Sequence, residues 1–317
     1  MAKKIALITG GTGQIGSYQA QYLLKKNYKV YVTTRKLKPN NNLKKLNILK
    51  KVNIITSSLK NKNEIAKIIN KIKPNEIYFY SGISNIQDTI KNPKKTTFHN
   101  YQICKNFIYV IKKDLPNCVF FNANSIQIFG NKKKKIKLSD KNFRPNTPYG
   151  KAKLKSFLFL QKYRKQFRLK LFNGLFLNTE SILRPKFYVL SKICYFVSKI
   201  HKKTKKKLLL GNINIKRDWG WCEEYVRIVW KYIQGNPNDF IIGTGKSFSL
   251  KQMIKFAFKK YNYQYQKYIY TKKSLIRKFE IENIRADISD TIKKTGITPK
   301  IYGPKLINKL LNHYHNE

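Results

Sequence analysis

With 317 residues, 42% of them hydrophobic, the chain can bury a sizeable core in one large or two smaller domains. No apolar run approaches the roughly 20 residues of a membrane span and no leader is expected, so we expect a cytoplasmic protein without a membrane partner. The four cysteines form no C-x-x-C pair, so we expect no metal site. The 67 basic and 15 acidic residues give a net charge of +52; the lysines are spread along the whole chain, which disfavours a nucleic-acid partner but would still attract an anionic substrate.

The first predicted strand, residues 5–9, leads into three glycines spaced G-x-x-G-x-x-G, and a predicted helix at 17–26 follows at once. Glycine permits the tight turn and the close approach of the backbone, while the free N–H groups and the dipole of the helix favour a pyrophosphate. The stretch therefore predicts a dinucleotide site. Its cofactor-binding residues are Gly10, Thr12, Gly13, Gln14, Ile15 and Gly16.

The second predicted strand, residues 29–34, is followed by basic rather than acidic residues. An acidic residue at this place would bind the adenosine ribose and favour NAD. Arg35 and Lys36 suit a 2′-phosphate instead, so the predicted cofactor is NADP.

The next segments alternate between short apolar strands and helices. This alternation predicts the α/β class with a doubly wound parallel sheet, in which ligands lie beyond the carboxyl ends of the strands. Ser81 follows the fourth strand, where a cofactor would pass. The predicted strands are 52–56, 76–80 and 118–123, and the predicted helices are 64–72 and 97–112.

A tyrosine and a lysine lie four residues apart on a predicted helix that starts near Pro148. Tyr149 and Lys153 therefore share one face, and the lysine is expected to lower the pKa of the phenol so that it works as an acid or base. Ser125, at the end of the fifth strand, can bind the same substrate oxygen. The three residues predict a catalytic site.

The second half of the chain is less regular, and its pattern changes near residue 180. We expect a Rossmann domain over residues 1–180 and a smaller α/β substrate domain over 181–317, from which some elements return to the first domain. The predicted strands are 171–178 and 240–242, and the predicted helices are 187–202, 222–234, 250–261, 292–295 and 305–313.

The motifs resemble those of the GDP-mannose 4,6-dehydratase family of extended short-chain dehydrogenases, over essentially the whole chain. Arg277, Glu280 and Asp287 also have the family's spacing. The stretches that carry the resemblance are Thr9–Tyr18, Lys73–Tyr78, Pro148–Lys153, Asn173–Ser181 and Lys216–Gly220.

The resemblance implies a mechanism. Tyr149 would take the proton from the sugar 4-hydroxyl, Lys153 would tune it, and Ser125 would stand for the family's catalytic threonine. The hydride passes from carbon 4 to NADP and returns to carbon 6 after a glutamate has removed the carbon-5 proton and water has left. The product is a 4-keto-6-deoxy sugar.

The resemblance also implies the binding residues and the assembly. Ser58, Leu59 and Ser81, together with Tyr149 and Lys153, would contact the cofactor. Independently of the resemblance, Asp218 is expected to pair with a neighbouring cation rather than to act as a base. Relatives form dimers or tetramers, so a homodimer or homotetramer is expected. The GDP-sugar would be held by Asn178, Glu180, Arg184, Arg217, Arg277 and Glu280.

Three positions depart from the family pattern. Gln127 stands where the glutamate base is expected, and an amide has no useful basicity. Phe187 replaces an asparagine near the diphosphate, and Ser58 replaces an aspartate at the adenine. Gln127 keeps an alternative open, a GDP-sugar 4-oxidoreductase or 4-epimerase without dehydration; a non-enzymatic nucleotide-sensing or nucleic-acid-binding module is disfavoured by the intact Ser125, Tyr149 and Lys153.

Overall fold

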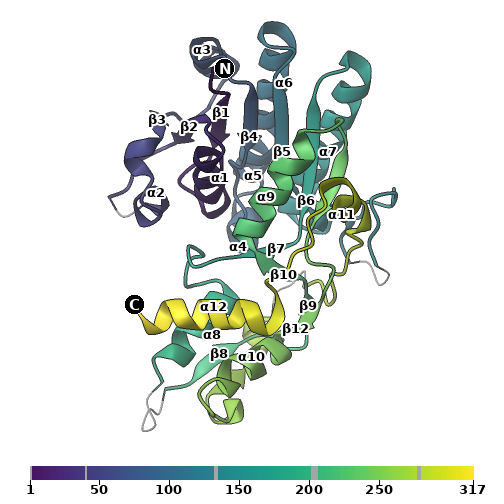
Figure 1. Ribbon diagram of the computed structural model, residues 1–317. Coiled ribbons are helices and arrows are strands. Elements are labelled where there is room, and N and C mark those ends of the chain that lie inside the picture. The colour runs from purple at the N-terminus through teal and green to yellow at the C-terminus, as the bar shows by residue number, and fades with distance from the viewer. Residues whose placement is uncertain (1, 40, 132–134, 201–205, 277–279) are drawn as a thin grey trace.

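The computed structural model describes residues 2–39, 41–131, 135–200, 206–276 and 280–317 (Figure 1). Seven strands form one sheet in the order β11-β6-β5-β4-β1-β2-β3, and every neighbouring pair is parallel. The order reverses between β1 and β4, as in doubly wound folds. The predicted sheet is therefore confirmed. Its strands are β1 (Ile5–Thr9), β2 (Lys29–Thr34), β3 (Asn53–Thr56), β4 (Glu76–Phe79), β5 (Val119–Ser125), β6 (Leu171–Phe176) and β11 (Asp239–Ile242).

Helices cover both faces of the sheet because its strands are apolar on both sides. In β1, Ala6 and Ile8 belong to the core beneath α1 and α9, whereas Leu7 belongs to the core beneath α3, α6 and α7. The bounds are α1 (Gln14–Lys25), α3 (Lys62–Ile72), α6 (Ile103–Asp114), α7 (Pro148–Phe167) and α9 (Cys222–Ile233). Short helices on the connections are α2 (Asn42–Lys45), α4 (Ile86–Lys91), α5 (Pro93–Thr97) and α11 (Ser289–Thr295).

A second core packs below the carboxyl ends of the sheet, where α8, α10 and the yellow C-terminal helix α12 lie together in Figure 1. Trp219 and Trp221 are buried in it. Its helices are α8 (Val189–Ser198), α10 (Leu250–Lys259) and α12 (Gly303–His315). Three two-stranded pairs lie outside the main sheet: β7 (Asn178–Glu180) with β10 (Trp219–Trp221), β9 (Lys216–Arg217) with β12 (Phe248–Ser249), and β8 (Leu208–Leu210) with β13 (Ile269–Thr271).

The second half of the chain contributes to both cores. β11 pairs with β6 at the edge of the sheet, and α9 packs on α1. The proposed boundary near residue 180 stays a prediction, because tertiary packing distributes the second half between two cores.

Two predicted elements differ from the structure. The helix expected at 97–112 is a π-helical turn, Phe98–Gln102, followed by α6. The strand expected at 171–178 ends at Phe176, because the Asn178 amide donates to the Asp218 carbonyl and starts the separate pair of β7 with β10. Among the described residues, no helix is long and apolar enough to span a membrane.

Candidate active site

The glycine turn joins β1 to α1 and leaves the start of the helix open. Gly10 has a φ of +68°, and a side chain on Gly16 would place its Cβ 2.4 Å from the Gly10 carbonyl oxygen. Gly13 caps α1 without a side-chain hydrogen bond, and the fully described first turn of this helix carries no acidic residue. The N-terminal N–H groups therefore remain available to an anion.

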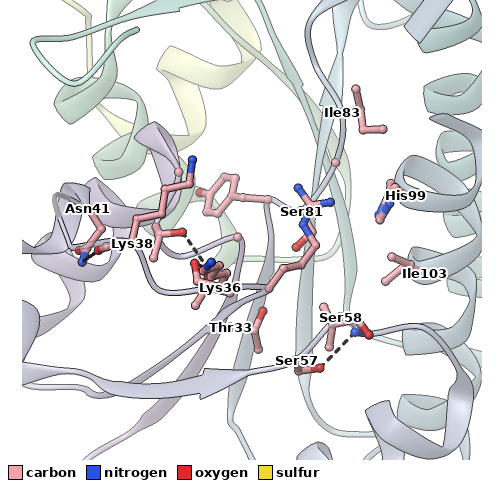
Figure 2. A pocket seen from close by; sticks show the side chains of 18 of the residues that line it. Thr33, Lys36, Lys38, Asn41, Ser57, Ser58, Ser81, Ile83, His99 and Ile103 are labelled. Atoms are coloured by element: carbon pink, nitrogen blue, oxygen red, sulfur yellow. Dashed lines mark hydrogen bonds between the residues drawn. The ribbon is translucent and has the colours of Figure 1, made fainter. Parts of the chain in front are cut away.

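A cavity of about 680 Å³ opens beside this turn at the carboxyl ends of β1, β2 and β4 (Figure 2). The turn residues Gln14, Ile15 and Gly16 are not among those lining it: the Gln14 side chain points to Thr179, and Ile15 packs in the core. The predicted cofactor residues that line the cavity are Gly10, Thr12, Gly13, Arg35, Ser58, Leu59 and Ser81.

Three cations from the segment after β2 face the cavity. Arg35 and Lys36 follow the strand directly, and Lys38 lies two residues further on (Figure 2). None of the described lining residues carries a carboxylate. The cavity is therefore electropositive and suits a ligand with several phosphates.

Several lining residues were missed from the sequence. The Asn42 amide donates to the Thr12 carbonyl at 3.0 Å and so holds the helix after β2 against the glycine turn. His99, in the π-helical turn, lines the opposite wall, and its pKa is lowered by burial and by the neighbouring Arg35 and Lys95. The sequence carries no local signal for His99, because its place depends on the packing of α6 against the sheet.

The floor of the cavity is a short loop after β3. The Glu64 carboxylate accepts hydrogen bonds from the Ser57 hydroxyl at 2.6 Å and from the Lys60 amide at 2.8 Å. Burial alone would raise the pKa of Glu64, but these bonds lower it. They fix the loop that presents Ser58 and Leu59, in which Leu59 has a φ of +55°.

The predicted catalytic residues meet at the carboxyl end of β5 and the start of α7. The side chain of Ser125 lies close enough to the phenol of Tyr149 to lower its pKa. Thr147 caps α7 by accepting from the Gly150 amide at 3.0 Å, and Pro148 occupies its first turn. This cap sets the direction in which Tyr149 leaves the helix.

Lys153 lies one turn further along α7, with its Nζ 5.8 Å from the centre of the Tyr149 ring. It is buried and donates to the Ala123 carbonyl at 2.7 Å. Burial lowers the pKa of Lys153 to about 8. The expected lowering of the Tyr149 pKa is wrong for this structure: burial raises it to about 12, against the smaller opposing effects of Ser125 and Arg184.

Gln127 lies in the 3-10 turn Ile126–Phe129 that follows β5. Its backbone amide donates to the Ser125 hydroxyl at 3.3 Å, and its side-chain oxygen accepts from Thr147 at 3.5 Å. The side-chain amide of Gln127 therefore lies beside the start of α7, close to Ser125, where the family pattern places a base.

Two of the predicted substrate residues, Glu180 and Arg184, lie next to each other. Arg184 donates to the Gln14 side chain at 3.2 Å, stacks on the Tyr188 ring at 3.6 Å, and lies 3.8 Å from the Glu180 carboxylate. Glu180 is buried, and burial raises its pKa to about 7 against the opposing effect of Arg184. This pair joins the glycine turn to the second core.

The remaining predicted substrate residues lie on other segments. Asn178 begins β7, and Arg217 donates to the Lys216 and Glu282 carbonyls at 2.8 and 3.4 Å, near the segment that starts at Glu280. Arg277 lies outside the described residues. Phe187, which stands where the family pattern has an asparagine, is 64% exposed, and its ring packs against that of Tyr188.

Asp218 serves the loop after β11 rather than a cation. Its carboxylate accepts from the Thr244 and Gly245 amides at 2.9 and 2.8 Å and from the Thr244 hydroxyl at 2.7 Å. The expected pairing with a neighbouring cation is therefore corrected to a set of loop hydrogen bonds.

Two of the solved structures that share this fold are named as sugar-nucleotide enzymes. The UDP-glucose 4-epimerase of Thermotoga maritima has a TM-score of 0.86 at 17% identity, covering 98% of this chain and 99% of that one. The dTDP-glucose 4,6-dehydratase of Bacillus anthracis has a TM-score of 0.84 at 16% identity, covering 99% and 97%. The fold is therefore that of the Rossmann-type epimerases and dehydratases.

Sequence comparison gives the family. The GDP-mannose 4,6 dehydratase of Cricetulus griseus is 31% identical over 81% of this chain and 72% of its own length. The GDP-mannose 4,6 dehydratase 1 of Arabidopsis thaliana is 27% identical over 98% and 89%. The family model described as GDP-mannose 4,6 dehydratase matches residues 7–310. The chain belongs to the GDP-mannose 4,6-dehydratase family, and the predicted enzyme class is confirmed.

Proposed function

We propose that this enzyme acts on a GDP-hexose such as GDP-mannose and converts it to a 4-keto-6-deoxy sugar, with NADP as its cofactor. The observation that carries the proposal is the meeting of Ser125, Tyr149 and Lys153 at the end of β5, one strand away from the cation-lined cavity. The family supports the choice of GDP-mannose, which its named members act on.

The residues around the glycine turn fit a dinucleotide. The N-terminus of α1 would hold the pyrophosphate, because its first turn has neither a side-chain cap nor an acidic residue. Arg35, Lys36 and Lys38 would hold a 2′-phosphate. When bound, NADP supplies hydride transfer to and from the sugar.

The chain's own residues move the protons. After the Tyr149 phenol has released its own proton to solvent, its phenolate would take the proton of the substrate 4-hydroxyl, beside Ser125. The buried Lys153 ammonium favours the phenolate electrostatically, and the Ala123 carbonyl fixes its position. Ser125 orients the substrate oxygen.

Gln127 leaves the dehydration step without a base at the position where the family pattern has a glutamate. Its amide cannot remove the carbon-5 proton, although it can donate a hydrogen bond to the leaving 6-hydroxyl. This residue supports the second candidate function, oxidation and reduction or epimerisation at carbon 4 without loss of water. In both candidates Tyr149 has the same role.

Incubation with GDP-mannose and NADP in deuterated water separates the candidates. A 4-keto-6-deoxy product with deuterium at carbon 5 supports dehydration. Stoichiometric NADPH, or a 4-epimer without deoxygenation, supports the second function. If no sugar nucleotide is turned over and the protein binds RNA tightly, both proposals fail.

We propose that Asn178, Glu180, Arg184, Arg217, Arg277 and Glu280 remain the residues toward the GDP-sugar. Arg217 is favoured for the phosphates because its guanidinium forms bidentate bonds. Arg184 already contacts Gln14, Tyr188 and Glu180. Glu180 and Arg184 would therefore support the substrate site indirectly.

We also propose a cytoplasmic homodimer or homotetramer. All four cysteines are buried free thiols, as expected in a reducing compartment. The outer side of α6 and α7 carries an aromatic cluster in which Phe159 stacks on Tyr163 at 4.3 Å, beside Leu158, which is 45% exposed. Light scattering on the purified protein tests this assembly, and a monomer at all concentrations would contradict it.

A further inference from the structure

A second cavity, of about 400 Å³, lies away from the glycine turn. Four segments that are distant in the sequence converge on it. Their side chains are mostly cations, and the remaining groups are small or polar. Those that the argument uses are Lys135, Lys216, Lys246, Ser247, Asn283 and Arg285.

Backbone pairing explains why the side chains meet. The segment 282–287 is extended between two partners: the Lys216 amide donates to the Glu282 carbonyl at 2.7 Å, and the Ile136 amide donates to the Arg285 carbonyl at 2.8 Å. Its even-numbered residues Ile284 and Ala286 are buried in an apolar cluster. The odd-numbered Asn283 and Arg285 therefore face the other way, toward the cavity.

The charges around this cavity are poorly balanced. Lys135 pairs with the Asp287 carboxylate at 3.2 Å. The pKa of Asp287 is lowered to about 2, chiefly by hydrogen bonds from Ser289 and also by Lys135. Within the described part of the chain, no carboxylate forms an ion pair with Lys216, Lys246 or Arg285. These cations are solvent-exposed at their positions around one cavity, where like charges repel one another and a bound anion relieves that repulsion.

Polar groups beside the cations add directional contacts. The Asn283 side-chain oxygen is buried with no hydrogen-bond partner in the described structure, and a half-turn of the amide presents its NH₂ group to a ligand. The Ser247 hydroxyl makes only a 3.4 Å bond to the Ile284 carbonyl. The fork of Arg285 matches two oxygens of one phosphoryl group.

We propose that this cavity is a second binding site, separate from the active site, for a small phosphate-bearing anion such as pyrophosphate or the diphosphate end of a nucleotide. Its volume admits a small ligand, which favours this class over a nucleic acid. The site does not depend on the proposed reaction, because none of its residues belongs to the catalytic group.

The test is a calorimetric titration of the full chain with pyrophosphate at constant ionic strength, repeated with GDP and with inorganic phosphate. The glycine turn and the proposed GDP-sugar residues around Arg217 offer places for the same probes, so the number of sites is counted. The cavity variant is Lys216→Gln/Lys246→Gln/Arg285→Gln. The matched control removes the same charge from exposed positions elsewhere, with Lys25→Gln/Lys67→Gln/Lys113→Gln.

We expect the cavity variant to lose one site, or to bind pyrophosphate at that site at least about tenfold more weakly, since each charge-assisted bond contributes on the order of one tenfold step in affinity. The control should change less than twofold. Binding of GDP with the same loss identifies a nucleotide ligand; binding of pyrophosphate alone identifies a free anion.

Equal weakening in both triple variants would mean diffuse attraction to a +52 surface and would overturn the proposal. An unchanged number of sites with unchanged affinities in the cavity variant would also overturn it. If the triple variant does not fold, Lys246→Gln is compared with Lys67→Gln in the same way. A catalytically dead Tyr149→Phe protein should keep the site, which separates this proposal from the proposed reaction.

Discussion

The two sides of the active site are built differently. On the cofactor side, one contiguous stretch of β1, the glycine turn, α1 and β2 places the turn and Arg35 around the cavity, and the ends of β3 and β4 complete it. The substrate side brings together Glu180, Arg184 and Arg217 from segments that meet only through tertiary packing. Both departures that bear on the sugar, Gln127 and Phe187, fall on the substrate side. Under the proposed function, the residues for hydride transfer face a substrate region that departs from the family pattern.

The largest expected effect is on the machinery common to both candidate reactions. Tyr149→Phe removes the acid–base group and should lower kcat by about 10⁴-fold, the upper range for general acid–base catalysis. NADPH binding, measured by fluorescence, should stay within about twofold, because a phenyl ring keeps the packing. Tyr163→Phe, on the outer part of the same helix, is the control and should leave kcat unchanged. Loss of cofactor binding in Tyr149→Phe would contradict the assigned role.

The second prediction concerns the base position. Gln127→Glu should increase the rate of 4-keto-6-deoxy product formation by about 10²-fold, the lower range for an added general base. The readout is deuterium incorporation at carbon 5 by mass spectrometry. Gln127→Ala lacks both amide and base and should show no such gain. If the wild-type protein already dehydrates as fast as Gln127→Glu, another group is the base.

The third prediction tests the buried Glu180, whose neighbour Arg184 contacts Gln14 and so joins the substrate side to the cofactor side. The pKa of Glu180 is raised to about 7 from 4.5, so the stability from its protonated form is present below pH 4.5 and lost as the pH rises to about 7. This loss is on the order of 3 kcal/mol. In urea unfolding, Glu180→Gln should flatten the pH dependence over this window, whereas exposed Glu223→Gln should retain it. An unchanged slope in Glu180→Gln would refute the assignment.

The smallest effect concerns cofactor choice. Arg35→Gln/Lys38→Gln should reduce the preference for NADP over NAD about tenfold, since charge-assisted hydrogen bonds to the 2′-phosphate are lost. The ratio of kcat/KM for the two cofactors measures it. Lys25→Gln/Lys67→Gln removes the same charge from exposed positions and should leave the ratio unchanged. A preference that survives in Arg35→Gln/Lys38→Gln would place the discrimination on other residues.

The sequence alone determined the local parts of this protein. The glycine spacing, the alternation of strands and helices, and the Tyr149–Lys153 interval predicted the sheet, the turn and the start of α7 because each depends on neighbours within one or two turns of chain. The same locality identified Gln127 as a departure.

Tertiary structure decided the rest. Burial set the direction of the Tyr149 pKa against the expectation from Lys153, because desolvation depends on the whole surrounding wall. Tertiary packing also directs Arg184 toward Gln14 and Asp218 toward the 244–245 loop, and it places His99 at the cavity. These contacts join residues more than 25 positions apart, and no periodicity in the chain records which distant segments will pack together.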